Sequence, residues 1–170
     1  MNNICNIKES MKNNRKELHV LAEIGNKEFQ TSNYIKNYLK NIGVDFEEYL
    51  ETAVVGMIKG KNPSKTIAFR ADMDALPIIE ESGVEFSSKT HGLMHACGHD
   101  AHTAILLGAA KVLSKMKDEI NGNIKFFFQE GEETFTGAKE IIKDGGMDGV
   151  DACFGLHCMP DLETGYVNID

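Results

Sequence analysis

The stretch from Thr66 to Ala71 reads Thr-Ile-Ala-Phe-Arg-Ala, and Asp72-Met73-Asp74 follows it directly. The uninterrupted apolar run Ile67-Ala68-Phe69 is typical of a strand that is buried on both faces of a sheet. The two aspartates therefore come just where this strand ends. Ligand sites in sheets of parallel strands gather at the carboxyl ends of the strands, so this stretch predicts one edge of a site as well as a strand.

Strands and helices alternate along the rest of the chain. Short apolar runs predict strands at 44–50, 53–58, 66–71, 124–128, 152–157 and 166–169. Apolar residues at helical spacing predict helices at 7–24, 31–42, 101–116 and 137–143. Thr31 and Asp100 are the expected N-caps, and Gly25 and Gly43 are the expected helix ends. The alternation predicts an α/β fold in which helices pack on a largely parallel or mixed sheet.

Composition and charge fit one globular domain. The chain has 170 residues, of which 42% are hydrophobic and 26% charged, enough for a hydrophobic core. The formal net charge of -8 argues against nucleic acid or an anionic membrane as a partner, since both select clustered Lys and Arg. The polar first residues do not resemble a secretory signal, and the four cysteines lack the spacing of a disulfide framework. A cytoplasmic protein with reduced thiols is expected.

The motif at 94–100, Met-His-Ala-Cys-Gly-His-Asp, places a thiol and an imidazole two residues apart at the start of a predicted helix. Glu132-Glu133 and His157 come later, each near or just past the end of a predicted strand. The sheet is expected to bring these residues and Asp74 together, although they are far apart in sequence. Thiolate, imidazole and carboxylate groups are ligands for zinc, manganese or nickel.

The chemistry of this set fits metal-dependent hydrolysis. A thiolate, two imidazoles and a carboxylate can bind one or two divalent cations, and binding keeps the thiol deprotonated. Of two adjacent glutamates, one can bind metal while its neighbour accepts a proton from water. A bound cation lowers the pKa of water from about 15.7 to about 7, which makes that water a nucleophile at neutral pH.

Each of these residues alone has a plainer interpretation. Cys97 alone is typical of a small buried side chain, His157 of a core histidine, and Glu132-Glu133 of a solvated charge pair. Asp72 and Asp74 alone are compatible with a simple turn. Their joint placement at strand ends and at a helix start favours a metal site.

Three further histidines, His91, His95 and His102, crowd the same region. Their spacing alone does not distinguish substrate contact from support of a ligand or a surface position. A cysteine hydrolase that uses Cys97 with a histidine is a weaker alternative, because the paired glutamates would then have no role.

Several segments together resemble the M20 metallopeptidase family. Within that family the similarity is to the amidohydrolase branch, which contains N-acyl amino acid amidohydrolases, hippurate hydrolases and auxin-conjugate hydrolases. The segments are Arg-Ala-Asp-Met-Asp-Ala-Leu-Pro at 70–77, Met-His-Ala-Cys-Gly-His-Asp-Ala-His-Thr-Ala at 94–104, Phe128-Gln129 ahead of Glu132-Glu133, and Gly155-Leu156-His157. The resemblance runs along essentially the whole chain, and its Cys-Gly-His-Asp block is specific.

The resemblance implies a partial zinc-exopeptidase-like catalytic domain with two divalent metal ions, whether manganese, zinc, nickel or cobalt. Their implied ligands are Cys97, His99, Glu133 and His157. Glu132 is the implied general base, and Asp74 matches the aspartate that supports a ligand near the metals. The implied reaction is hydrolysis of the amide bond of a small N-acyl amino acid; the alternative is a dipeptidase or carboxypeptidase of the same family.

Two departures from the family pattern stand out. The family usually reads Gln-Pro-Ala-Glu-Glu where this chain reads Gln-Glu-Gly-Glu-Glu at 129–133, which is expected to add a charge and flexibility beside the glutamates. Family members also continue into a lid and dimerisation domain, through which they often dimerise, and into a C-terminal catalytic segment with a final metal-binding histidine. Residues 1–170 are therefore expected to form the N-terminal part of the catalytic domain, with impaired activity; a non-catalytic metal-binding remnant is the rival hypothesis.

Overall fold

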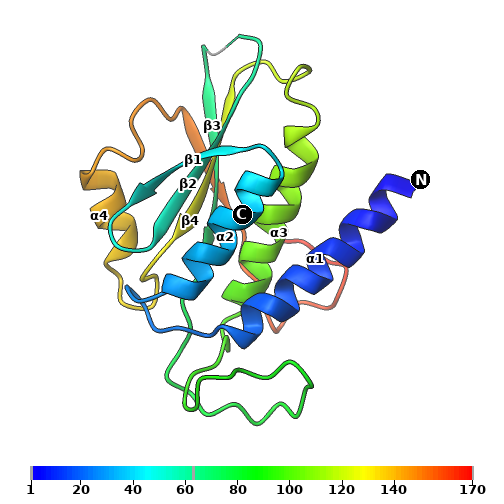
Figure 1. The fold of residues 1–170 in the computed structure, drawn as a ribbon, viewed down its shortest axis with the longest axis vertical. Helices are drawn as coiled ribbons and strands as arrows, with labels where there is room; N and C mark the ends of the chain where they lie inside the picture. The colour runs from blue at the N-terminus through cyan, green and yellow to red at the C-terminus, as the bar shows by residue number, and fades with distance from the viewer. Residues whose placement is uncertain (1, 63, 170) are drawn as a thin grey trace.

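A five-stranded mixed sheet forms the centre of the protein (Figure 1). The computed structural model describes residues 2–62 and 64–169, with side chains from residue 7 onward. The strands are β1 (Asp45–Tyr49), β2 (Ala53–Lys59), β3 (Thr66–Asp72), β4 (Asn123–Gln129) and β5 (Ala152–Gly155), in the order β1-β2-β4-β3-β5. β2 is antiparallel to both β1 and β4, whereas β3 is parallel to both β4 and β5. The predicted α/β fold with a mixed sheet is confirmed.

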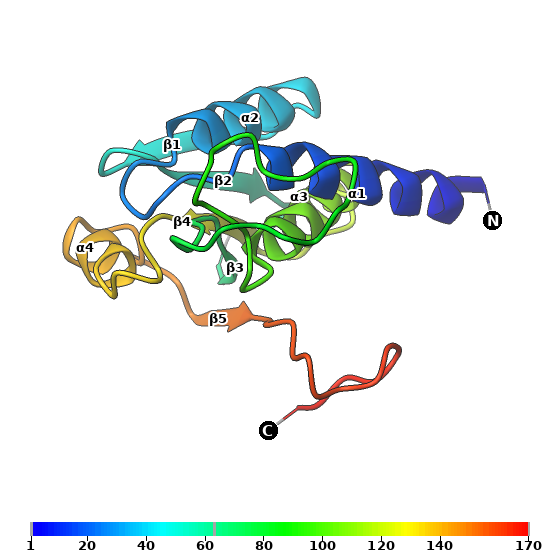
Figure 2. The same cartoon turned by 90° about the horizontal axis from the view of Figure 1, so that it is seen from below.

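Helices cover both faces of this sheet. They are α1 (Asn2–Val20), α2 (Phe29–Asn41), α3 (His99–Ser114) and α4 (Gly137–Lys143). Figure 2 shows α1, α2 and α3 on one side of the sheet and α4 on the other. Every helix among the described residues is too short or too polar to cross a membrane.

The central strand β4 divides the hydrophobic core into two layers. Successive side chains of a strand point to opposite faces, so Phe126 and Phe128 pack with α1, α2 and α3 while Phe127 packs with Ile141 of α4. Phe126 and Phe128 are fully buried, and Phe127 nearly so. This double burial anchors the carboxyl end of β4, from which the paired glutamates follow.

The expectation that β3 is buried on both faces holds only in part. Ala68 is fully buried, but the side chain of Ile67 is 41% exposed. Ile67 pairs with Ala152 of β5, an edge strand whose four residues are all exposed. The apolar pattern alone does not show that the neighbouring strand is a short, exposed strand at the edge of the sheet.

The chain after β5 also differs from expectation. Residues 166–169 form no strand, and Figure 2 shows the last segment leading away from the sheet. A strand requires a hydrogen-bonded neighbour, which the apolar alternation of a sequence does not supply. The predicted strand at 152–157 is shorter for a related reason, since it pairs with β3 only as far as Gly155.

Helix ends differ from the predictions because distant residues determine them. α1 ends at Val20 and not at residue 24, and Ile24 instead forms a bridge with Ala75. α2 begins at Phe29, so Thr31 lies in its first turn, where its backbone N–H and hydroxyl both donate to the carboxylate of Glu23. Glu23 thus performs the capping expected of Thr31.

The thiols agree with the expectation of reduced cysteines where they are described. Cys97, Cys153 and Cys158 are free. The side chain of Cys5 lies outside the described residues.

Candidate metal centre

Three parallel strands deliver the candidate residues to one edge of the sheet. β3 ends at Asp72, just before Asp74; β4 ends four residues before Glu133; and β5 ends at Gly155, just before His157. Because β3 is parallel to both neighbours, all these carboxyl ends lie at the same edge. The predicted meeting of these segments is confirmed as a matter of geometry.

Gly98 turns the chain into α3 and places a donor on each side of itself. Its φ is +86°, in the left-handed region where a side chain is disfavoured. A Cβ at this position would lie 3.5 Å from Cβ of Cys158. The turn presents Cys97 before the helix and His99 as the first helical residue.

His99 lies at the centre of the cluster and is fully buried. Its Nδ1 lies 3.0 Å from Oδ1 of Asp74, whose other oxygen accepts the backbone N–H of Glu133 at 2.9 Å. Its Nε2 is buried and has no hydrogen-bond partner among the described residues. It lies 3.9 Å from Oε2 of Glu132 and 3.8 Å from Oε1 of Glu133. An unpartnered buried nitrogen that faces carboxylate oxygens at this separation fits a cation between them.

Cys97 and His157 complete a second group of donors around His99. The Sγ atom of Cys97 lies 3.4 Å from Nε2 of His157. Nδ1 of His157 donates to the carbonyl oxygen of Cys158 at 2.8 Å, which leaves the lone pair of Nε2 facing the thiol. The donor atoms of Cys97, His99 and His157 all lie within 4.8 Å of one another, as do those of His99, Glu132 and Glu133. His99 belongs to both groups, and this donor set fits divalent cations.

The electrostatics of the cluster also favour a cation. Burial, followed by the charge of Glu133, raises the pKa of the Cys97 thiol to about 11. Burial lowers the pKa of His99, but its hydrogen bond with Asp74 and the charge of Asp72 outweigh burial and raise it. Neighbouring carboxylates contribute to both shifts, after burial for Cys97 and against burial for His99. A bound cation would offset this negative charge and hold the thiol as thiolate.

Asp72, His99 and His102 form a third group of donor atoms within 4.8 Å of one another. All three side chains are fully buried. Nδ1 of His102 lies 2.6 Å from Oδ1 of Asp72, and His102 is thereby placed beneath the cluster and not on the surface.

The other two histidines of this region differ in burial. His91 is exposed. His95 is buried, burial lowers its pKa to about 4, and neither of its ring nitrogens has a partner among the described residues. His95 packs beside His19, with ring centroids 6.0 Å apart.

Asp100 is not the N-cap of α3, because the helix begins one residue earlier and Gly98 occupies the N-cap position. Its Oδ2 instead accepts hydrogen bonds from Nε of Arg15 at 2.8 Å and from Nδ1 of His19 at 2.7 Å. These bonds join the first turn of α3, next to His99, to α1.

The extra carboxylate expected beside the paired glutamates is that of Glu130, and it is directed elsewhere; hydrogen bonds hold the glycine that was expected to add flexibility. Glu130 is buried, and its Oε2 accepts the backbone N–H groups of Thr52 and Ala53 as well as the Thr52 hydroxyl. Its charge therefore points away from the cluster. Gly131 has a φ of +57°, and its N–H donates to Oε1 of the buried Glu28 at 2.8 Å. The loop is pinned, and glycine serves its backbone conformation.

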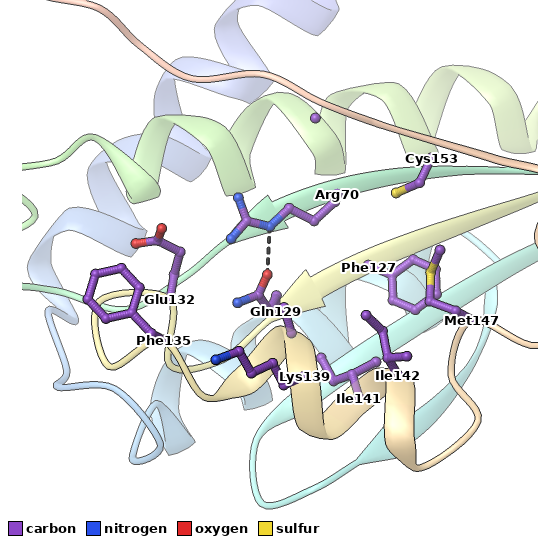
Figure 3. A pocket seen from close by; sticks show the side chains of 12 residues that line it. Arg70, Phe127, Gln129, Glu132, Phe135, Lys139, Ile141, Ile142, Met147 and Cys153 are labelled. Atoms are coloured by element: carbon purple, nitrogen blue, oxygen red, sulfur yellow. Dashed lines mark hydrogen bonds between the residues drawn. The ribbon is translucent and has the colours of Figure 1, made fainter.

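A cavity of about 640 Å³ opens beside Glu132 on the α4 side of the sheet (Figure 3). Figure 3 shows Glu132 and Phe135 at one end and the apolar side chains Phe127, Ile142 and Met147 at the other. Nε of Arg70 donates to Oε1 of Gln129 in the wall between them, at 2.8 Å. Glu132 thus borders both the group of donor atoms around His99 and the cavity. The sequence pattern did not indicate the cavity, because its walls come from separate elements without a shared motif.

Known proteins share this arrangement of elements. The chain is 49% identical over 155 residues to thermostable carboxypeptidase 2 of Saccharolobus solfataricus, a match that covers 89% of this chain and 39% of the relative. It is 45% identical over 157 residues to N-acyl-L-amino acid amidohydrolase of Geobacillus stearothermophilus, covering 91% of this chain and 42% of the relative. The chain therefore spans about two fifths of the length of these relatives.

A crystal structure agrees with the sequence relatives. A Bacillus subtilis protein described as a dinuclear metal binding peptidase from the M20 family superposes with a TM-score of 0.89 at 39% identity, over 92% of this chain and 44% of that one. The sequence profile of Peptidase family M20/M25/M40 matches residues 68–170, from β3 through the segment that follows His157. The chain belongs to peptidase family M20/M25/M40.

Proposed function

We propose that this protein is a metal-dependent amidohydrolase that cleaves the amide bond of N-acyl amino acids. The observation that carries the proposal is the unpartnered Nε2 of His99, shared by two groups of donor atoms. The proposed ligands of two divalent cations are Cys97, His99, Glu133 and His157. Similarity to an M20 protein described as binding a dinuclear metal supports the number of cations, and similarity to an N-acyl-L-amino acid amidohydrolase supports the substrate class.

The proposed general base is Glu132. Its carboxylate lies 3.9 Å from Nε2 of His99 and borders the cavity, so it stands between the proposed ligands and the space next to them. Bound cations would polarise the substrate carbonyl and lower the pKa of the attacking water. Glu132 accepts a proton from that water and delivers it to the leaving amine.

Asp74 is the proposed support of the centre. It holds Nδ1 of His99 and the backbone N–H of Glu133 at the same time, so one carboxylate orients the His99 ring and fixes the backbone at Glu133. Because the chain spans only part of its relatives' length, activity of the whole protein is part of the proposal. The assignment of residues 1–170 to the N-terminal part of the catalytic domain stays a prediction.

A carboxypeptidase is the second candidate, because thermostable carboxypeptidase 2 is 49% identical to this chain. Both reactions are amide hydrolysis and need the same donor atoms, so the cluster itself does not separate them. Parallel assays of turnover on N-acetyl amino acids and on unblocked dipeptides would separate the two activities. Turnover restricted to the dipeptides would replace the amidohydrolase proposal with the carboxypeptidase one.

Metal binding tests the centre independently of turnover. The purified chain is titrated with Mn²⁺, Zn²⁺, Ni²⁺ and Co²⁺, and bound metal is measured after gel filtration. Cys97→Ser should lose bound metal, whereas Cys153→Ser, which alters a free thiol on β5, should not. Equal metal content in the two variants would contradict the proposed ligand set, and activity that survives exhaustive chelation would favour the cysteine-hydrolase alternative.

A further inference from the structure

His102 has a hydrogen-bonding state that its partners define. The backbone N–H of Cys158 lies 2.9 Å from Nε2 of His102, and an amide N–H can only donate, so Nε2 is an acceptor. The hydrogen of the neutral ring is then on Nδ1, which donates to Oδ1 of Asp72 at 2.6 Å. Both nitrogens of this fully buried ring are in use.

Asp72 is itself held in place from several directions. Its Oδ2 accepts from Nη1 of Arg70 at 2.8 Å, and its backbone carbonyl accepts from the hydroxyl of Thr103 at 2.8 Å. Asp72 is therefore fixed at the end of β3, and its Oδ1 offers His102 an acceptor in a defined position.

The segment on the other side of His102 has few supports of its own. Residues 151–169 are all exposed, and β5 ends two residues before His157. The ring of His157 lies edge-on to that of His102, with centroids 4.7 Å apart. The bond from the Cys158 N–H to His102 thus ties the exposed segment to α3 at the residue next to His157.

We propose that His102 is a positioning residue that fixes the backbone at Cys158 and thereby holds His157 beside Cys97. The same geometry indicates that the group formed by Asp72, His99 and His102 does not bind a cation, because the lone pair of His102 Nε2 is already engaged. The effect of His102 on metal affinity rests on the proposed function of His157 as a ligand. The effect of His102 on the backbone at Cys158 is independent of that proposal.

Two substitutions separate this role from simple packing. In His102→Gln, the side-chain carbonyl reaches the place of Nε2 and can accept the Cys158 N–H. In His102→Asn, the shorter amide reaches the place of Nδ1 and can donate to Asp72, but the Cys158 N–H loses its acceptor. Both variants remove the imidazole and both keep a polar amide, so each is the control for the other.

The first readout is hydrogen exchange of the amides at 156–160, measured without metal. We expect exchange to be at least several-fold faster in His102→Asn than in wild type, and close to wild type in His102→Gln. The second readout is Co²⁺ affinity, followed by the thiolate absorption of the Cys97 complex. We expect affinity to fall about tenfold in His102→Asn and to stay near wild type in His102→Gln, with His157→Ala as reference for complete loss of that ligand.

Equal effects of the two variants would overturn the proposal, because packing alone would then explain both. Unchanged exchange in His102→Asn would also overturn it, whatever happened to metal affinity. If wild type bound no Co²⁺, the proposed metal centre would fail. The exchange difference would in that case still support the tie between His102 and Cys158, so the two failures are distinguishable.

Discussion

Oδ1 of Asp74 lies 3.0 Å from Nδ1 of His99 and determines which nitrogen of that ring faces the donor cluster. With Nδ1 held by the carboxylate, Nε2 is left for a cation. Asp74 is only 1% exposed, so water does not compete for this hydrogen bond. The relationship links the end of β3 directly to the start of α3, and it leads to the first prediction.

Replacing Asp74 with alanine should weaken cation binding by about tenfold to a hundredfold, the usual effect of removing the partner that orients a metal-binding histidine. Both His99 and the Glu133 backbone lose their acceptor in this variant. Isothermal titration with Zn²⁺ or Mn²⁺ measures the change. Asp118→Asn alters an exposed aspartate and is the control. Wild-type affinity in Asp74→Ala would show that His99 is oriented by other contacts.

Glu132→Gln should lower turnover by about a hundredfold to ten-thousandfold, the range for loss of a general base, while metal content stays unchanged. The amide keeps the size of the side chain but no longer accepts a proton from water. Activity and bound metal are measured on the same preparation. Glu140→Gln, an exposed change on α4, provides the comparison. A loss of metal together with activity would reassign Glu132 as a ligand.

The stability contributed by His19 should decrease at alkaline pH. Its hydrogen bond with Asp100 favours the charged ring, burial opposes it, and the bond with Glu80 adds to the first effect, so the pKa is raised above 6.5. A raised pKa gives a contribution that is fully present below pH 6.5 and is lost as pH rises through the folded-state value.

Urea unfolding of wild type and His19→Gln between pH 5.5 and 9 tests this sign. We expect His19→Gln to cost about 1.5 to 3 kcal/mol at the acidic end, as for hydrogen bonds to charged groups, and less at the alkaline end. A cost that grew with pH would mean that the ring is neutral in the folded protein.

The stability contributed by Glu28 should also decrease as pH rises. Thr52 has one hydroxyl hydrogen, yet its oxygen lies 2.8 Å from Oε2 of Glu28 and 2.6 Å from Oε2 of Glu130. Burial raises the pKa of Glu28, so a protonated Glu28 can donate to Thr52 while Thr52 donates to Glu130. The stability from Glu28 is therefore present below pH 4.5 and lost as pH rises through the raised value.

Glutamine imitates the protonated acid, so Glu28→Gln should be as stable as wild type at pH 4.5 and more stable at pH 8. Glu28→Ala should cost about 1 to 3 kcal/mol, because Gly131 and Thr52 each lose a buried partner. Chemical unfolding at the two pH values gives both differences. If Glu28→Gln were less stable than wild type at pH 8, the carboxylate would be the form that the fold prefers.

Local patterns predicted the bounds of two elements closely. Helix 137–143 was predicted to the residue, and the strand ending at Phe128 to within one residue at each end. The phenylalanines of β4 are divided between the two core layers, and Ile141 of α4 is buried in one of them, so sequence period and tertiary packing agree at these positions. Where packing thins, at Ile67 and at residues 166–169, the same patterns overstated burial and pairing.

The sequence indicated which residues gather around His99, but it did not indicate the distant residues that hold their neighbours in place. Residue type and placement at strand ends indicated the cluster around His99, because parallel strands share an edge. The partners of Asp100 lie 81 and 85 residues away, and those of Glu130 lie 77 and 78 residues away. Such pairings leave no periodic trace, so an acidic residue before a helix was interpreted as a cap and one beside a site as an added charge.

The exposed edge strand β5 pairs with β3 and ends two residues before His157, so its stability affects where His157 lies. Its four residues pair with β3 on one side and are exposed, so little buried surface holds them. A cation bound through His157 would bind only when β5 is docked, and by mass action it would stabilise the docked state. The free energy needed to detach β5 from β3 would then rise with the concentration of free metal. The stability of this strand would depend on the metal that His157 binds.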